Sequence, residues 1–235
     1  MESRRREGLT EEIEAVRGAV PEWVAVREGT VRYLAAPWRG QKTGAFLDQR
    51  PNRLLAGTLA VPGGRALDCF AYHGSFALHL ASRAGHVTAL DVSAEALSRG
   101  AENARLNQLS NIEWLEADAF EQLRQWDRER HRFDTIVVDP PAFAKSKATA
   151  PEALRGYKEI NLRAMRLLAP GGTLLTASCS FHIRRAEFLT MLESAARDSG
   201  RRLTLVQLLG QGVDHPEVIT IPETGYLKGA VLTAS

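Results

Sequence analysis

The chain has 235 residues, 44% of them hydrophobic and 25% charged, a composition typical of a globular protein with a full buried core. The net charge of +2 is compatible with a nucleic-acid partner but does not by itself indicate one. No apolar run approaches the roughly 20 residues of a membrane span, and residues 1–7 lack the apolar segment of a secretory signal. The two cysteines have no metal-ligand spacing, so we expect a protein of the reducing cytoplasm with no membrane and no metal partner.

The sequence pattern predicts a small α+β extension over residues 1–60, followed by a larger domain over residues 61–235. Its expected elements are a helix over 10–17 with Thr10 as N-cap, a hairpin of strands 24–27 and 31–34, and a helix over 48–59. Glu28-Gly29-Thr30 supplies the hairpin turn, and Pro62-Gly63-Gly64 ends the second helix.

From Arg65 onward, short apolar runs alternate with helical patterns. Strands are expected over residues 66–70, 87–92, 112–115, 133–138, 173–178, 203–208 and 229–233. Helices are expected over 75–84, 94–108, 120–128, 152–168 and 184–199, with Ser93 as an N-cap and a turn at Pro170-Gly171-Gly172. This alternation predicts βαβ units and a doubly wound α/β domain with a parallel sheet. The polar residues 142–151 are expected to form a mobile loop beside the site.

One strand of this domain ends in an acid followed by two prolines, in the stretch Val137-Val138-Asp139-Pro140-Pro141. Proline cannot donate to a sheet ladder and fixes φ, so the chain must leave the sheet stiffly at this point. The Asp139 carboxylate is therefore held at the carboxyl end of its strand, where open α/β sheets bind ligands.

Acids also follow the three earlier strands of the domain. The loop after the first strand has Gly74 but no G-x-G-x-x-G, and Asp68 before it would repel a phosphate. Asp68 would suit the cationic amino group of S-adenosylmethionine (SAM), while Ser75 can cap the next helix. Asp91 can accept the ribose hydroxyls, and Asp118 can accept the adenine amino group. Four acids without the phosphate glycines predict a SAM site, with another nucleoside cofactor as the alternative.

Cys179 follows the fifth strand and is flanked by serines, whereas Cys69 is expected to be a core residue. The fourth and fifth strands are neighbours in doubly wound sheets, so Cys179 and Asp139 should face each other across one cleft. A thiolate that adds to carbon 6 of a pyrimidine turns carbon 5 into a nucleophile. Asp139 can hydrogen-bond or protonate ring nitrogen 3. Nearby cations such as Lys42, Arg50 or Lys145 would favour the thiolate.

Several motifs together resemble the bacterial large-subunit ribosomal RNA cytosine-C5 methyltransferases of the PUA-containing type. The motifs are Gly40-Gln41-Lys42-Thr43-Gly44, Phe46-Leu47-Asp48-Gln49-Arg50, Asp68-Cys69-Phe70 with its loop to Phe76, Asp139-Pro140-Pro141-Ala142-Phe143, Ser178-Cys179-Ser180 and Pro222-Glu223-Thr224-Gly225-Tyr226-Leu227-Lys228-Gly229. The resemblance implies a seven-stranded class I SAM-methyltransferase sheet, a small α+β module before it, and Cys179 as nucleophile. Only about 60 residues precede the sheet domain, so we expect a short member without the PUA domain.

The resemblance also completes the set of expected contacts. The cofactor contacts expected are Lys42, Thr43, Phe46, Arg50, Asp68, Phe70, Tyr72, Gly74, Ser75, Asp91, Ser93, Asp118 and Asp139. The substrate contacts expected are Pro140, Phe143 and Lys145, with Phe143 either stacking on a flipped-out base or wedged against a helix. The expected partner is large-subunit ribosomal RNA, and a homodimer is left open.

Three alternatives remain open at this point. A related methyltransferase could act on uracil carbon 5, on a guanine ring nitrogen, or on a protein or small molecule. A non-enzymatic SAM-binding assembly factor would bind SAM without transferring a methyl group. The chain could also depend on a partner for RNA binding. For the first alternative the activity of a Cys179→Ala variant decides, because guanine or amino-group transfer needs no cysteine and would keep full turnover.

Overall fold

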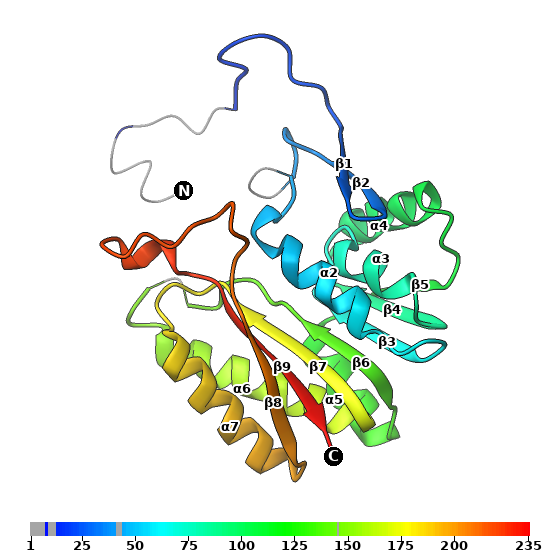
Figure 1. The fold of residues 1–235 in the computed structure, drawn as a ribbon, viewed down its shortest axis with the longest axis vertical. Coiled ribbons are helices and arrows are strands. Elements are labelled where there is room, and N and C mark those ends of the chain that lie inside the picture. The colour runs from blue at the N-terminus through cyan, green and yellow to red at the C-terminus, as the bar shows by residue number, and fades with distance from the viewer. Residues whose placement is uncertain (1–7, 9–12, 41–43, 145) are drawn as a thin grey trace.

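The computed structural model describes residues 8, 13–40, 44–144 and 146–235, and within them seven strands form one sheet of order β5-β4-β3-β6-β7-β9-β8 (Figure 1). The strands are β3 (Arg65–Cys69), β4 (His86–Asp91), β5 (Ile112–Glu116), β6 (Phe133–Val138), β7 (Leu168–Ser178), β8 (Leu203–Leu209) and β9 (Lys228–Ala234). Strands β3 to β7 are parallel, and β9 pairs antiparallel with β7 and with β8. The predicted doubly wound sheet is therefore confirmed, with an antiparallel end.

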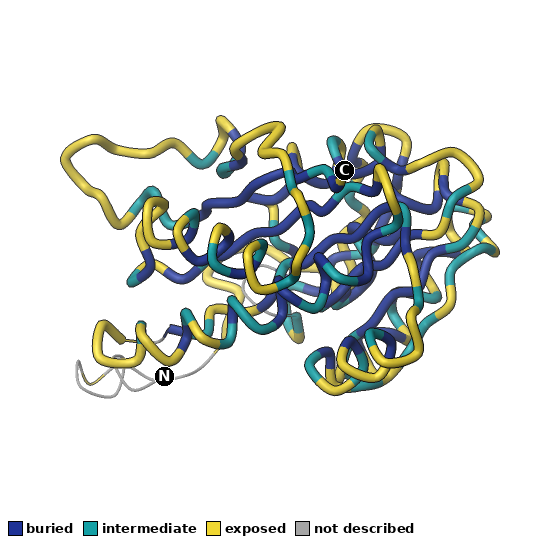
Figure 2. Tube along the Cα trace, turned by 90° about the horizontal axis from the view of Figure 1, so that it is seen from below, coloured by how far each residue is buried: buried dark blue, intermediate teal, exposed yellow. Residues whose placement is uncertain are grey.

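Helices cover both faces of the sheet (Figure 1). One face carries α2 (Arg50–Leu59), α3 (Ser75–Ala81) and α4 (Ala94–Leu106); the other carries α5 (Ala119–Glu129), α6 (Ala150–Leu167) and α7 (Arg185–Ser199). Successive side chains of a strand point to opposite faces, so Val137 packs with α2 and α3 while Ile136 and Val138 pack with α5, α6 and α7. The strands β3, β4, β6, β7 and β9 are consequently mostly buried, whereas the edge strand β8 is largely exposed (Figure 2). No described helix is long and apolar enough to cross a membrane.

Two local predictions need correction. Pro170-Gly171-Gly172 does not precede the fifth strand of the sheet but lies inside β7. Leu168 pairs with Phe133 and Thr173 with Thr135, so residues 169–172 bulge opposite a single residue of β6. The helix predicted over residues 10–17 is absent from residues 13–17, while its predicted cap, Thr10, lies outside the described residues.

The predicted hairpin is present as β1 (Val24–Glu28) and β2 (Val31–Ala35). Its inward side chains, including Tyr33, form a buried cluster with Leu78 of α3 and Ala104 of α4. The hairpin and the sheet domain therefore share a hydrophobic contact, and the division at residue 60 stays a prediction.

A buried group of charges also links the hairpin to the helices. Glu28 receives hydrogen bonds from Arg53 of α2, with Nε at 2.7 Å and Nη2 at 2.6 Å, and Nε2 of His79 on α3 lies 3.0 Å from it. Glu28 and Arg53 are 3% and 1% exposed, so solvent screens this pair little. Burial raises the pKa of Glu28, but the hydrogen bonds and charges of Arg53 and His79 outweigh it and bring the pKa to about 2.

Removing the cation should therefore destabilise the protein strongly. We expect Arg53→Met to lower the free energy of unfolding by about 3–5 kcal/mol, because it leaves the Glu28 carboxylate buried without its partner. Urea denaturation measures this change. The matched control is Arg197→Met, whose ion pair with Glu193 is exposed and should contribute about 1 kcal/mol or less. Equal effects of the two substitutions would contradict this account.

The same group predicts an acid-dependent loss of stability. Because the folded protein lowers the pKa of Glu28 from 4.5 to about 2, its carboxylate stabilises the fold above pH 4.5. That contribution, on the order of 3 kcal/mol, is lost as the pH falls from 4.5 through 2. Denaturation of wild type and Glu28→Gln at several pH values tests this: the difference between them should shrink with acidification. A pH-independent difference would refute it.

Candidate active site

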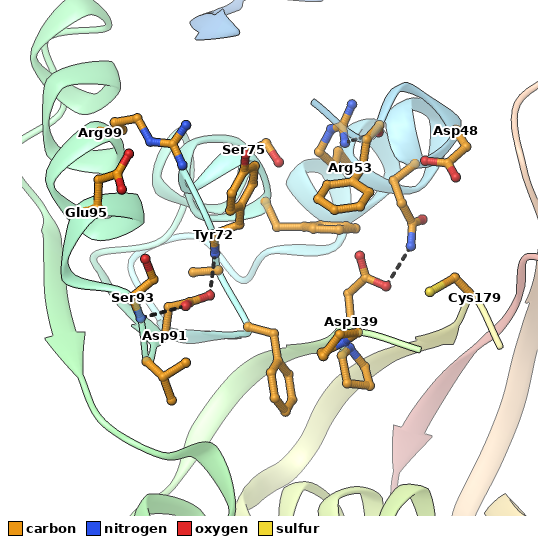
Figure 3. Close-up of a pocket in the computed structure, with 18 of the residues that line it drawn as sticks. Asp48, Arg53, Tyr72, Ser75, Asp91, Ser93, Glu95, Arg99, Asp139 and Cys179 are labelled. Atoms are coloured by element: carbon orange, nitrogen blue, oxygen red, sulfur yellow. Dashed lines mark hydrogen bonds between the residues drawn. The ribbon is translucent and has the colours of Figure 1, made fainter. Parts of the chain in front are cut away.

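A cavity of about 360 Å³ lies at the carboxyl ends of β3, β4, β6 and β7, the edge at which doubly wound sheets bind ligands (Figure 3). Its opposite side is lined by residues of the N-terminal extension, namely Phe46, Asp48, Gln49 and Arg53. The cavity brings together nine of the residues predicted from the sequence: Phe46, Phe70, Tyr72, Ser75, Asp91, Ser93, Asp139, Pro140 and Cys179.

The turn after β3 holds two of these residues in a strained backbone conformation. Phe70 and Tyr72 have φ values of 64° and 51°, a left-handed conformation that costs a non-glycine residue about 1 kcal/mol or more. The strain is held by hydrogen bonds from Ala71 N to Leu90 O and from Gly74 N to Ala71 O. Gly74 does not line the cavity; a Cβ there would lie 2.4 Å from the Trp114 ring, so close packing requires glycine. The turn presents its aromatic side chains to the cavity.

Asp91 is fixed at the end of β4 by the backbone around it. Its Oδ2 accepts a hydrogen bond from Tyr72 N at 2.8 Å, and its Oδ1 accepts one from Ser93 N at 3.0 Å (Figure 3). Each carboxylate oxygen can accept a second bond, so both remain suited to a pair of vicinal hydroxyls. Ser93 caps α4 as predicted, accepting from Ala96 N at 3.2 Å.

Asp68 lies behind the turn instead of on the cavity lining. It is 1% exposed, and its Oδ2 accepts a hydrogen bond from Ala77 N in the first turn of α3 at 2.8 Å. Its Oδ1 has no hydrogen-bond partner among the described residues. Burial, followed by the negative charges of Asp139 and Asp91, raises the pKa of Asp68 well above its usual range. Three acids thus share one region, where a cationic ligand would relieve their repulsion.

Asp139 is held from the far side of the cavity by the extension. Gln49 Nε2 donates to its Oδ1 at 2.8 Å (Figure 3). Gln49 is itself oriented by Asn52, whose Nδ2 donates to Gln49 Oε1 at 2.6 Å and to Gly210 O at 3.0 Å. Arg53 fixes the same segment through a 2.7 Å bond from Nη1 to Phe46 O. The carboxylate therefore has a set orientation at the mouth of the cavity.

Cys179 follows β7 and is partly exposed on the lining, on the side of Asp139 (Figure 3). Cys69 is fully buried in the core, as predicted, and burial followed by the charge of Asp68 raises the pKa of its thiol well above the usual range. The two thiols therefore differ in access, and only Cys179 meets the cavity within the described part of the chain.

Several predicted residues lie away from the cavity. Phe143 does not line the cavity: its ring packs 4.6 Å from that of Tyr157 and 5.9 Å from that of Phe120, which supports the wedge against the helices, while a contact with a base stays a prediction. Arg50 forms an ion pair with Asp214 at 3.3 Å, and Asp118 caps α5 by accepting from Glu121 N at 3.0 Å. Lys42, Thr43 and Lys145 lie outside the described residues. The roles predicted for Arg50, Asp68, Gly74 and Asp118 in cofactor binding remain predictions without support from the lining.

Sequence reasoning missed several lining residues. Gln49 belongs to the motif Phe46-Leu47-Asp48-Gln49-Arg50, but the sequence indicates no role for it. Arg53 follows one turn later on α2. Arg99, one turn and a half into α4, lies 4.9 Å from the centre of the Tyr72 ring. The sequence places a charged residue, Arg53, on the helix predicted over 48–59, which could have marked it as a lining residue. No sequence pattern around Arg99 indicates that its side chain faces a cavity.

Comparisons with known proteins agree with this architecture. The model of a family described as S-adenosylmethionine-dependent methyltransferase matches residues 5–230. Ribosomal RNA large subunit methyltransferase I of Aeromonas salmonicida is 43% identical over 98% of this chain and 59% of its own length. The protein of the same name from Pseudoalteromonas atlantica is 41% identical over 97% of this chain and 58% of its own. The chain thus spans less than two thirds of these relatives.

One solved structure illustrates the likeness of the fold. A SAM-dependent methyltransferase from Streptococcus mutans superposes with a TM-score of 0.81 at 21% identity, covering 92% of this chain and 56% of that one. At this identity the similarity supports the fold.

The geometry around Asp91 yields a binding prediction. We expect Asp91→Asn to weaken SAM binding by about 10- to 100-fold, because the variant loses the charge that strengthens bonds to two hydroxyls. Titration calorimetry with SAM measures this. Glu193→Gln, an exposed acid on α7, is the control and should bind like wild type. Unchanged affinity in the Asp91 variant would remove Asp91 from the cofactor site.

Proposed function

Because this chain belongs to the family of S-adenosylmethionine-dependent methyltransferases, we propose that it methylates carbon 5 of a cytosine in large-subunit ribosomal RNA. The observation that carries the proposal is the shared cavity of Asp139 and Cys179, at the ends of neighbouring strands. The choice of RNA is supported by relatives at 41–43% identity that are named for large-subunit ribosomal RNA.

The residues around the cavity fit SAM by their chemistry. Asp91 presents two fixed acceptors for the ribose hydroxyls, and the acids near Asp68 favour a ligand that carries positive charge without phosphate. Phe70 and Tyr72 add aromatic surface for a flat base. When bound, SAM supplies a methyl group made electrophilic by its positive sulfur. The buried, unpartnered Oδ1 of Asp68 is consistent with a cationic neighbour in the loaded protein.

Cys179 is the proposed nucleophile. Its thiolate adds to carbon 6 of the cytosine, which makes carbon 5 electron-rich enough to take the methyl group. A base then removes the proton from carbon 5, and the electron pair of that bond expels the Cys179 thiolate. Cysteine suits this cycle because a thiolate both adds and leaves readily.

We propose that Asp139 hydrogen-bonds to the ring edge of the target base. A carboxyl group beside ring nitrogen 3 can donate or hold a proton there, which stabilises the charge that develops as the thiolate adds. The hydrogen bond from Gln49 and the stiff Pro140-Pro141 exit fix the carboxyl group before the base arrives. Preorganisation of this kind lowers the cost of reaching the transition state.

Incubation of the protein with methyl-labelled SAM and total RNA, followed by nucleoside analysis, tests the proposal. The expected product is 5-methylcytidine. We expect Cys179→Ala to lower the rate by on the order of 10³-fold or more, and Asp139→Asn to lower it by about 10²-fold. Circular dichroism spectra of both variants, measured separately, show that they are folded.

Three outcomes would overturn the proposal. Label in 5-methyluridine or in a methylated guanine would change the target base. Full activity of Cys179→Ala would exclude the covalent route. Binding of SAM with no transfer to any RNA would favour a protein that needs a further RNA-binding partner or is not an enzyme.

A further inference from the structure

A buried lysine, Lys228, lies next to the chain segment that contains Cys179 and has no role in the proposed reaction. Lys228 is the first residue of β9 and is only 2% exposed. It pairs across the sheet with Ser178, the residue that precedes Cys179. Lysine is rarely buried to this extent, because removing an ammonium from water is costly unless nearby groups compensate. We therefore expect nearby groups to stabilise the positive charge of Lys228.

The ammonium group is held by backbone on both sides. Nζ of Lys228 donates to Ser180 O, and it donates to Tyr226 O at 2.9 Å. Ser180 follows Cys179 directly, and its hydroxyl lies 2.9 Å from that of the buried Tyr157. An ammonium has three hydrogens, so these two bonds leave one for a further acceptor within the described part of the chain.

The charges around Lys228 favour a pairing with the cysteine. Burial lowers the pKa of Lys228 to about 8, while a negative charge on Cys179 raises it. From α7, the charge of Arg185 lowers the pKa and that of Glu187 raises it. Tyr226 faces the same region but donates its hydroxyl to Asp48 at 2.6 Å, and burial followed by that bond raises its pKa above the usual range. At pH 7 the lysine is thus mainly protonated.

We infer that Lys228 is a positioning residue that stabilises the thiolate of Cys179 and fixes the end of β7 through Ser180. The thiol proton leaves to solvent, the ammonium stays protonated, and the pair is neutral overall. The inference rests on the proposed function in one respect: the pair provides the thiolate nucleophile that the proposed methyl transfer requires at neutral pH. A neutral donor could also satisfy the two carbonyls, so the proposed thiolate is what accounts for a full positive charge at this position.

The reactivity of the thiol toward iodoacetamide tests the inference without any RNA. The chain has two cysteines, and Cys69 is fully buried, so the rate reports Cys179. Lys228→Gln keeps donors for the two carbonyls but removes the charge. We expect it to slow alkylation at pH 7 by about tenfold and to shift the pH dependence upward. Lys228→Arg, which keeps the charge, should retain most of the wild-type rate.

Lys158→Gln is the matched control, because Lys158 lies on α6 in an ion pair with Asp198 and should alkylate like wild type. If the Lys228 variants do not fold, wild type alone still tests the inference: its alkylation should reach half its maximum below about pH 8.5, the value of a free thiol. A wild-type midpoint at or above that pH, or identical profiles for wild type and Lys228→Gln, would overturn the inference.

Methyl transfer separates this inference from the proposed function. If both hold, Lys228→Gln lowers the transfer rate at pH 7 by about the same tenfold and recovers as the pH rises. If wild type transfers no methyl group to RNA but the alkylation profile shifts as expected, the proposed function fails and the lysine–thiolate pair stands. If transfer occurs and alkylation is unaffected by the charge, the inference fails alone.

Discussion

The parallel pairing of β6 with β7 is the constraint on which the candidate site depends. Val138 pairs with Thr176, so Asp139 leaves β6 at nearly the level at which β7 ends, and Cys179 emerges beside it. The antiparallel β9 adds a second consequence. A strand that runs against its neighbour begins where that neighbour ends, so Lys228 starts at the same edge. A parallel strand in that place would carry its first residue to the opposite edge.

Local patterns in the sequence were sufficient for most strands and helices, and for residues whose role is local. Ser93 and Asp91 were predicted because capping and strand-end positions depend on near neighbours. Lys228 and Gln49 were given no role because their partners lie 48 and 90 residues away, and the register that joins them is not visible in a pattern. Phe143 is ambiguous for a related reason: an aromatic residue after a turn suits either a ligand or a helix, and its contact with Tyr157 becomes visible only in the folded structure.

The extension contributes order as well as surface. Arg53 joins Glu28 of the hairpin to Phe46 O of the lining segment, while Gln49 of the same segment holds Asp139. One buried guanidinium thus couples the hairpin to the orientation of a proposed catalytic carboxylate. Apolar residues in place of both Glu28 and Arg53 could fill the space, but they could not hold the Phe46 carbonyl. This coupling gives a physical reason for a costly buried charge.

Charge is distributed unevenly across the cavity. Figure 3 places Asp139 between Asp91 and Cys179, and both Asp139 and Asp91 repel the charged form of the buried Asp68. Lys228 lies on the side of Cys179. The acids therefore favour a cationic ligand at one end of the cavity, and Lys228 favours the proposed thiolate at the other. Because a buried site screens charges less than water does, both preferences are strengthened there. Asp139 lies where the two ends meet, the position that the proposed proton-holding role at the ring edge of a base requires.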